Sequence, residues 1–156
     1  MKAAVKLAGV FAVLAPVQAF AVTGNIPFNG TVTDTCVITV GSSGTIAPNT
    51  AYTVLGSTET GGAPGTATIL ATGSGFNVFA DAPTAWGTAP ASASTAVFAT
   101  TYSLSGANTA SNVAGATGTA LSNFGTTNAS VNLTATLPSG TYEAGAYAAT
   151  VVLRCE

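Results

Sequence analysis

The chain has 156 residues, of which 47 % are hydrophobic and only 5 % are charged. This length suits one domain. Outside a removable leader at the start of the chain, Arg154 is the only basic residue, against five acids. Such a surface excludes binding to nucleic acid or to an anionic membrane, because nothing would neutralise the phosphates. A charged fraction far below the usual ~25 % favours a protein packed against copies of itself over a poorly soluble secreted monomer.

The first 21 residues have the pattern of a secretory signal peptide. Lys2 and Lys6 form a positive region, residues 7–17 are a short apolar run, and residues 19–21 (A-F-A) are a cleavage site. The apolar run is too short to span a bilayer, and no other run could cross a membrane. We therefore expect an exported, non-membrane-spanning chain that begins at Val22 and keeps 135 of the 156 residues.

The stretch from Val22 to Cys36 alternates between apolar or small residues and polar residues. The inward set consists of Val22, Gly24, Ile26, Phe28, Gly30 and Val32. Alternation with a period of two predicts a half-buried strand. A segment at the free end of a chain is loose unless something ties it down. This strand therefore needs a groove, either in its own body or in that of a neighbour.

The rest of the chain, residues 36–156, predicts short strands and no amphipathic helix. Predicted strands cover 36–40, 51–56, 66–72, 76–80, 95–104, 127–137 and 144–155, with a short extended piece at 45–47. Residues 105–123 are predicted to be a long loop interrupted by short extended pieces. The last strand would place on one face Tyr147, Ala149, Val151, Leu153 and Cys155. Turn signals between the strands indicate an all-β, two-sheet sandwich of immunoglobulin-like size.

The two cysteines of an exported chain are expected to form a disulfide. Cys36 opens the first strand of the body, and Cys155 lies near the end of the last strand. If these strands run antiparallel around one groove, both cysteines lie at the same end of it. Strands two places apart in a sheet are too far apart for a disulfide, so the bond requires a point where the groove narrows. An intermolecular bond and two free thiols are the alternatives.

The residues needed for common catalytic and metal sites are missing from the sequence. The chain has no histidine, which excludes Ser-His-Asp and Cys-His arrangements. Four acids are scattered over separate predicted turns or termini, at Asp34, Glu59, Asp81 and Glu143, so neither a carboxylate pair nor a metal or cofactor site is expected. We interpret the chain as a non-enzyme. Aromatic side chains that could stack on a sugar, although core packing is favoured, are Trp86, Tyr52, Tyr102, Tyr142 and Tyr147.

Residues 24–38, G-N-I-P-F-N-G-T-V-T-D-T-C-V-I, closely resemble the start of mature chaperone–usher pilus (fimbrial) subunits. The pattern in that family is G-x-V-x-F-x-G-x-V-x-x-x-x-C. Residues 140–142 (G-T-Y) and the strand 147–153 resemble the end of such subunits less specifically. Two departures indicate a divergent branch. Family members usually bridge neighbouring body strands with their cysteines, whereas the second cysteine here is Cys155, and the spacing before Cys36 is one residue short.

The resemblance implies an incomplete immunoglobulin-like sandwich at residues 36–156, completed by the N-terminal extension, residues 22–35, of a neighbouring subunit. Val22, Ile26, Phe28 and Val32 would fill pockets of the groove, and Gly30 would lie where a bulky group cannot enter. The strand that would line the groove carries Tyr147, Ala149, Val151 and Leu153. Implied partners are other copies of the chain, a periplasmic chaperone and an outer-membrane usher. The expected product is a filament on the bacterial surface that supports adhesion or biofilm formation.

Two other interpretations remain open. In the first, a secreted monomeric sandwich inserts its own N-terminal strand and binds glycans through Trp86 and nearby tyrosines. In the second, the chain is a coat protein that packs sideways. Only residues 33–35, without Gly or Pro, separate Val32 from Cys36. This link runs straight on and cannot easily turn back, so it favours donation of the strand to another copy.

Overall fold

The computed structural model describes residues 21–156, and almost all of the expected signal peptide lies outside them. The chain divides into two units, residues 1–30 and residues 31–156, and the second unit contains every strand of the described residues. Residues 21–35 belong to no strand. No helix within the described residues is both long enough and apolar enough to cross a membrane.

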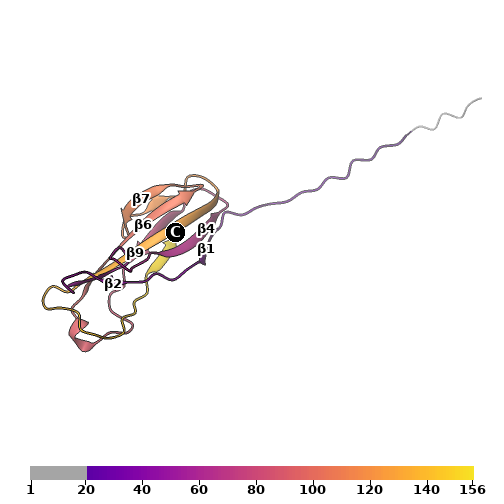
Figure 1. Ribbon diagram of the computed structural model, residues 1–156. Coiled ribbons are helices and arrows are strands. Elements are labelled where there is room, and N and C mark those ends of the chain that lie inside the picture. The colour runs from indigo at the N-terminus through magenta and orange to yellow at the C-terminus, as the bar shows by residue number, and fades with distance from the viewer. Residues whose placement is uncertain (1–20) are drawn as a thin grey trace, which may run out of the picture. The chain divides into compact units, whose positions relative to one another are not determined.

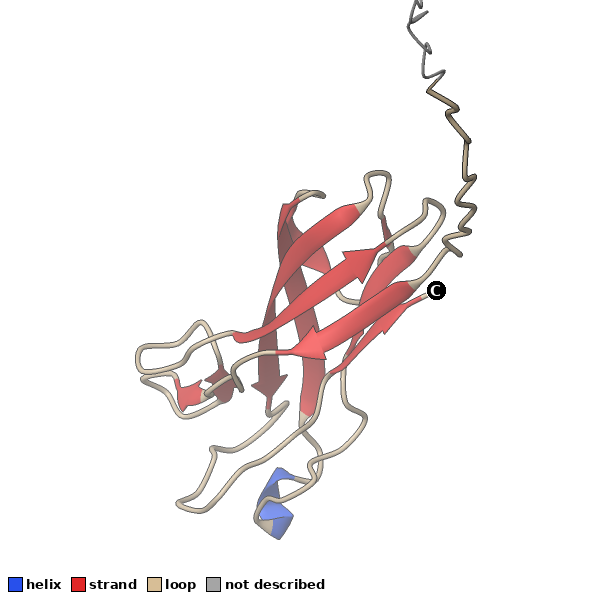
Figure 2. Cartoon of the chain, turned by 90° about the vertical axis from the view of Figure 1, so that its right-hand side faces the viewer, coloured by secondary structure: helices blue, strands red, loops and turns tan. Residues whose placement is uncertain are grey.

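The second unit is all-β, as the sequence predicts. Its strands are β1 (Cys36–Val40), β2 (Ala47–Pro48), β3 (Val54–Gly56), β4 (Gly65–Ala71), β5 (Asn77–Asp81), β6 (Val97–Gly106), β7 (Ala110–Ala114), β8 (Thr119–Ala120), β9 (Gly125–Thr136) and β10 (Val152–Cys155). The only helix in residues 21–156 is one 3-10 turn, Ala91–Ala93. It lies among the loops at one end of the strands, whereas the C-terminus lies at the other end (Figure 2).

The strands form two antiparallel sheets (Figure 1). In the larger sheet, β9 pairs with β6 along one edge, and β7 follows β6. Along its other edge β9 pairs first with β4 and then with β3, and β1 lies beyond β4. The smaller sheet has the order β10-β5-β8. In the larger sheet, β1 pairs with a strand on one side only, and in the smaller sheet the same holds for β10. We call the other side of each of these strands its free edge.

The core lies between the two sheets and depends on the period-two burial of the long strands. Alternate residues of β9 are buried, among them Ala129 and Ala135, because successive side chains point to opposite faces. Tyr102 of β6 is fully buried. Its hydroxyl forms hydrogen bonds with three groups, two on strands of the smaller sheet and one in the loop before β8. These partners are Val78 O at 2.8 Å, Thr117 O at 2.8 Å and Thr119 Oγ1 at 2.7 Å.

Two strands are shorter in the structure than the sequence predicts. β3 starts at Val54 rather than at residue 51, because the Asn49 carboxamide oxygen accepts hydrogen bonds from the amides of Thr53 and Val54 and closes a turn. The predicted strand 144–155 is regular only over β10. Its partner β5 ends at Asp81, just before Pro83. The residues before β10 therefore pair only through the isolated bridge between Ala148 and Thr88.

Candidate functional site

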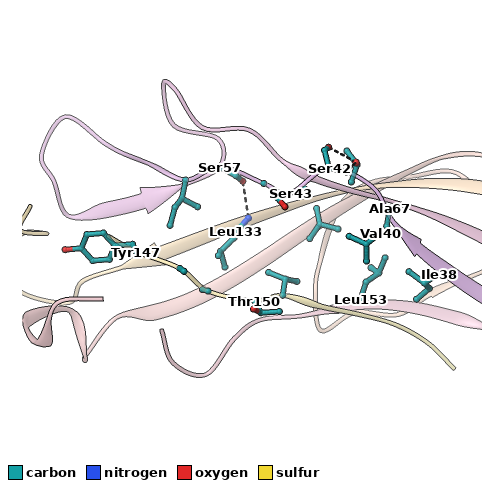
Figure 3. A pocket seen from close by; sticks show the side chains of 18 residues that line it. Ile38, Val40, Ser42, Ser43, Ser57, Ala67, Leu133, Tyr147, Thr150 and Leu153 are labelled. Atoms are coloured by element: carbon teal, nitrogen blue, oxygen red, sulfur yellow. Dashed lines mark hydrogen bonds between the residues drawn. The ribbon is translucent and has the colours of Figure 1, made fainter. Parts of the chain in front are cut away.

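An apolar groove lies between the free edges of the two sheets. A cavity of about 480 Å³ separates β1 and the loop that follows it from the chain leading into β10. Its apolar lining includes Ile38, Val40, Ile46, Ala67, Val131, Leu133, Tyr147, Ala148, Ala149, Val151 and Leu153. In Figure 3 the side chains of Ile38, Val40 and Leu153 lie near one end and Tyr147 lies at the other. The structure thus places on this groove all four last-strand residues singled out from the sequence.

The β1 side of the groove presents unpaired backbone groups. The ladder to β4 uses the carbonyl of Thr35 and the amide of Gly41, which bond to Thr72 and Thr66. Backbone hydrogen bonds of an antiparallel pair alternate along the strand, so the even residues between them direct their amides and carbonyls toward the groove. The side chains of two of these, Cys36 and Ile38, also pack inward.

The opposite side of the groove has the same property. The backbone groups of Ala148 bond to those of Thr88, and the backbone groups of Glu156 bond to those of Asn77. The even-numbered residues of the segment 148–156 therefore direct their backbone amides and carbonyls away from the groove. By the same alternation, odd-numbered residues direct their backbone groups toward the groove. Val151 and Leu153 pack their side chains against the core. A strand inserted here could pair with both edges and also cover apolar side chains.

The disulfide between Cys36 and Cys155 closes one end of the groove. Its Cα atoms are 6.3 Å apart, which is within the usual range for a disulfide. The predicted pairing is confirmed, and it occurs within one chain. The expected narrowing is present as well, because the bond joins the start of β1 to the end of β10.

Aromatic residues gather at the opposite, open end of the groove. Trp86 packs edge-to-face on Phe98, Tyr142 and Tyr147 with ring centroids 4.8–6.2 Å apart. Burial raises the pKa of the Tyr142 and Tyr147 hydroxyls. These rings contact one another, which favours core packing over sugar stacking. Tyr102 lies in the main core between the sheets.

A second cavity, of about 360 Å³, continues the groove beyond Tyr147. Ile46 and Tyr147 line both cavities, and Pro48, Leu55 and Gly145 are among the other residues of the second. The half-exposed ring of Tyr52 also lines it. The groove thus extends from the disulfide, past the aromatic cluster, to an apolar pocket at its open end.

The opening segment presents exposed apolar side chains. Val22, Ile26, Phe28 and Val32 are 94 %, 77 %, 92 % and 81 % exposed. At the two glycines of the alternating set, Gly24 and Gly30, no atom lies within 4 Å of the point that a Cβ would occupy. Almost the whole apolar surface of this segment is therefore exposed in the single chain.

An ion pair crosses the smaller sheet outside the groove. The Arg154 guanidinium donates to both carboxylate oxygens of Asp81, and it lies 4.7 Å from the centre of the Phe79 ring. The hydrogen bond from Arg154 holds the pKa of Asp81 below its ordinary value of 3.8, against a smaller opposing effect of desolvation. Among residues 21–156 no three His, Cys, Asp or Glu side chains are grouped as metal ligands would be.

This ion pair predicts a specific sensitivity to acid. A carboxyl group with a depressed folded-state pKa stabilises the fold above its unfolded pKa, and the contribution is lost as the pH falls through the folded value. We expect the free energy of unfolding of Asp81→Asn to fall less than that of the wild type below about pH 4. Denaturant titrations at several pH values would measure it. Equal slopes for the wild type and Asp81→Asn would contradict the prediction.

No protein-family model matches the chain, and no curated protein or solved structure is significantly similar to it.

Proposed function

We propose that the chain is a structural subunit of an extracellular pilus or fimbrial filament. In this proposal each copy is an immunoglobulin-like sandwich that lacks one strand, and the opening segment of a neighbouring copy fills the groove. The observation that carries it is the combination, in one chain, of an apolar groove with two unpaired strand edges and an exposed segment of alternating apolar side chains. The chaperone and the usher come from the sequence resemblance.

The energetics support a durable contact. Burial of Val22, Ile26, Phe28 and Val32 contributes about 1.5–3 kcal/mol each, or about 6–12 kcal/mol together. Each hydrogen bond to the groove edges adds about 0.5–1.5 kcal/mol. The inserted strand would also cover Val40, which is 78 % exposed in the single chain. Ordering of the segment offsets part of this sum, but the remainder suits a contact that rarely opens.

The segment is joined to its own body by residues 33–35, which we call its root. The position of this root determines the direction of insertion. The segment leaves its own body next to Cys36, at the disulfide end. A contact that repeats without closing must join unlike ends of successive copies, so the root must meet the neighbour's open end near Tyr147. Val22 then points toward the neighbour's disulfide, and the inserted strand runs antiparallel to β10. The reverse direction would join like ends and would give closed pairs.

The sizes of the facing side chains agree with this direction. When Gly30 lies beside Tyr147, three of the four facing pairs combine a large residue with a small one, and the fourth pairs two branched side chains. The resulting neighbours are Phe28 with Ala149, Ile26 with Val151, and Gly24 with Leu153. Val32 then reaches the second cavity at the open end. If the direction is reversed and Ile26 stays beside Val151, Phe28 meets Leu153 and Gly24 meets Ala149, a poorer fit for a close-packed interface.

Gly30 and Tyr147 therefore provide a test of the register. We expect Gly30→Val to reduce the fraction of chain in multimers, because the added side chain collides with the Tyr147 ring. Tyr147→Ala should restore assembly of Gly30→Val by making room for it. The multimer fraction is measured by electrophoresis of unheated samples, with thermal unfolding to establish that Tyr147→Ala is folded. Normal assembly of Gly30→Val, or no restoration in the double variant, would contradict the register.

The proposed function itself is tested by examining the material that the producing bacterium exports. We expect thin filaments in electron micrographs and a ladder of multimers on gels of unheated samples, collapsing to one band on boiling. Dispersed single copies in both measurements would overturn the proposal. They would favour the secreted monomeric sandwich.

A further inference from the structure

The root of the opening segment is fixed to the body by one threonine. The Thr72 hydroxyl donates to the carbonyl oxygen of Thr33 at 2.9 Å and accepts from the amide of Thr35 at 2.9 Å. The Thr72 amide donates to the carbonyl of Thr35, also at 2.9 Å. These bonds continue the ladder between β1 and β4 past Cys36, the first residue of β1. The chain is thus held in line with β1 as far back as Thr33.

This attachment leaves no slack between two joined copies. In the proposed register, Val32 is already seated in the neighbour, and the next residue, Thr33, is already bonded to its own body. Residues 31–35 contain neither Gly nor Pro, so the link has no residue suited to an abrupt change of direction. The two bodies must therefore meet end to end rather than hang on a flexible linker.

We infer that Thr72 is a positioning residue that fixes the angle between consecutive copies and makes the filament stiff. This inference rests on the proposed function. It also predicts the spacing of the copies. From Val32, seated level with the neighbour's Ile46, to the donor's own Ile46 the chain spans about 14 residues. Fully extended, these residues would cover about 46 Å at ~3.3 Å per residue, and the bend at Ser42 shortens that distance. That length is the upper bound for the subunit repeat along a straight thin filament.

The test compares filament shape among three threonine variants. Thr72→Val keeps the size of the side chain and removes the hydroxyl, Thr72→Ser keeps the hydroxyl, and Thr39→Val removes an exposed hydroxyl from β1 away from the root. Persistence length is measured from electron micrographs of filaments exported by the producing cell. We expect a shorter persistence length for Thr72→Val alone. Wild-type stiffness in Thr72→Val would overturn the inference.

A second variant tests the same idea without altering Thr72. Insertion of Gly-Ser between Val32 and Thr33 leaves the inserted strand unchanged and adds slack to the link. We expect filaments that still give the multimer ladder but bend more than those of the wild type. Unchanged stiffness here would also overturn the inference. Absence of filaments from the wild type would instead refute the proposed function, so the two failures can be distinguished.

Discussion

Phe28→Arg is expected to abolish assembly while leaving the body folded. Phe28 is 92 % exposed in the single chain, so its replacement removes no contact from the sandwich. In the proposed filament its ring lies beside Ala149, in the middle of the groove, where a guanidinium would be buried without a partner. An unpaired charge in an apolar site costs several kcal/mol, and the burial energy of Phe28 is lost as well. The multimer ladder of unheated samples should therefore collapse to a single band.

Asn29→Arg is the matched control for this substitution. Asn29 is adjacent in the chain and exposed, and the alternation places it on the face of the segment that points away from the groove. The same charge at this position should leave the ladder intact. If both variants lose assembly, the cause is the added charge in general and not its position. A normal ladder for Phe28→Arg would contradict the role assigned to the segment.

Removal of the disulfide is expected to cost the isolated subunit about 4–5 kcal/mol of folding free energy by the loop-closure estimate. The bond closes a loop between residues that are 119 apart in sequence, so the unfolded chain gains much freedom when Cys36 and Cys155 are both replaced by Ser. The loss is large compared with the usual stability of a small domain, about 5–15 kcal/mol. Many copies of the double variant should therefore unfold near body temperature.

Chemical denaturation in the Phe28→Arg background measures this effect without interference from assembly. The comparison is between the cysteine pair and the serine pair, with the reduced form of the cysteine chain as a second comparison. Similar unfolding midpoints for the serine pair and the oxidised parent would show that the cross-link adds little to the free energy of folding. The stabilising role given to the disulfide would then be wrong.

The sequence predicted the sheets well wherever one face of a strand is buried. The alternation over residues 127–137 corresponds to β9, and the apolar run 66–72 corresponds to β4. The pairing of Cys36 with Cys155 followed from export and from the position of each cysteine on its strand. These features depend on local periodicity and on one covalent rule, both of which a single sequence carries.

The floor of the groove could not be predicted in the same way. The pattern of 127–137 identifies Val131 and Leu133 as inward-facing, but only the packing of the two sheets reveals that both line the groove. The regular part of the last strand was overestimated because alternation continues through 144–151 although Ala148 has only an isolated bridge to Thr88. Thr72 gave no signal, since its bonds to Thr33 and Thr35 join residues almost forty positions apart.

The most direct test of strand donation uses two defective copies that repair each other. Phe28→Arg has an intact groove and a defective segment, whereas Ala149→Trp has an intact segment and a groove filled by the indole. Each variant alone should remain monomeric. Expressed together in the producing cell, they should form one heterodimer that survives unheated electrophoresis, with no larger species. Monomers alone in the mixture would contradict donation of the segment from one copy to the groove of another.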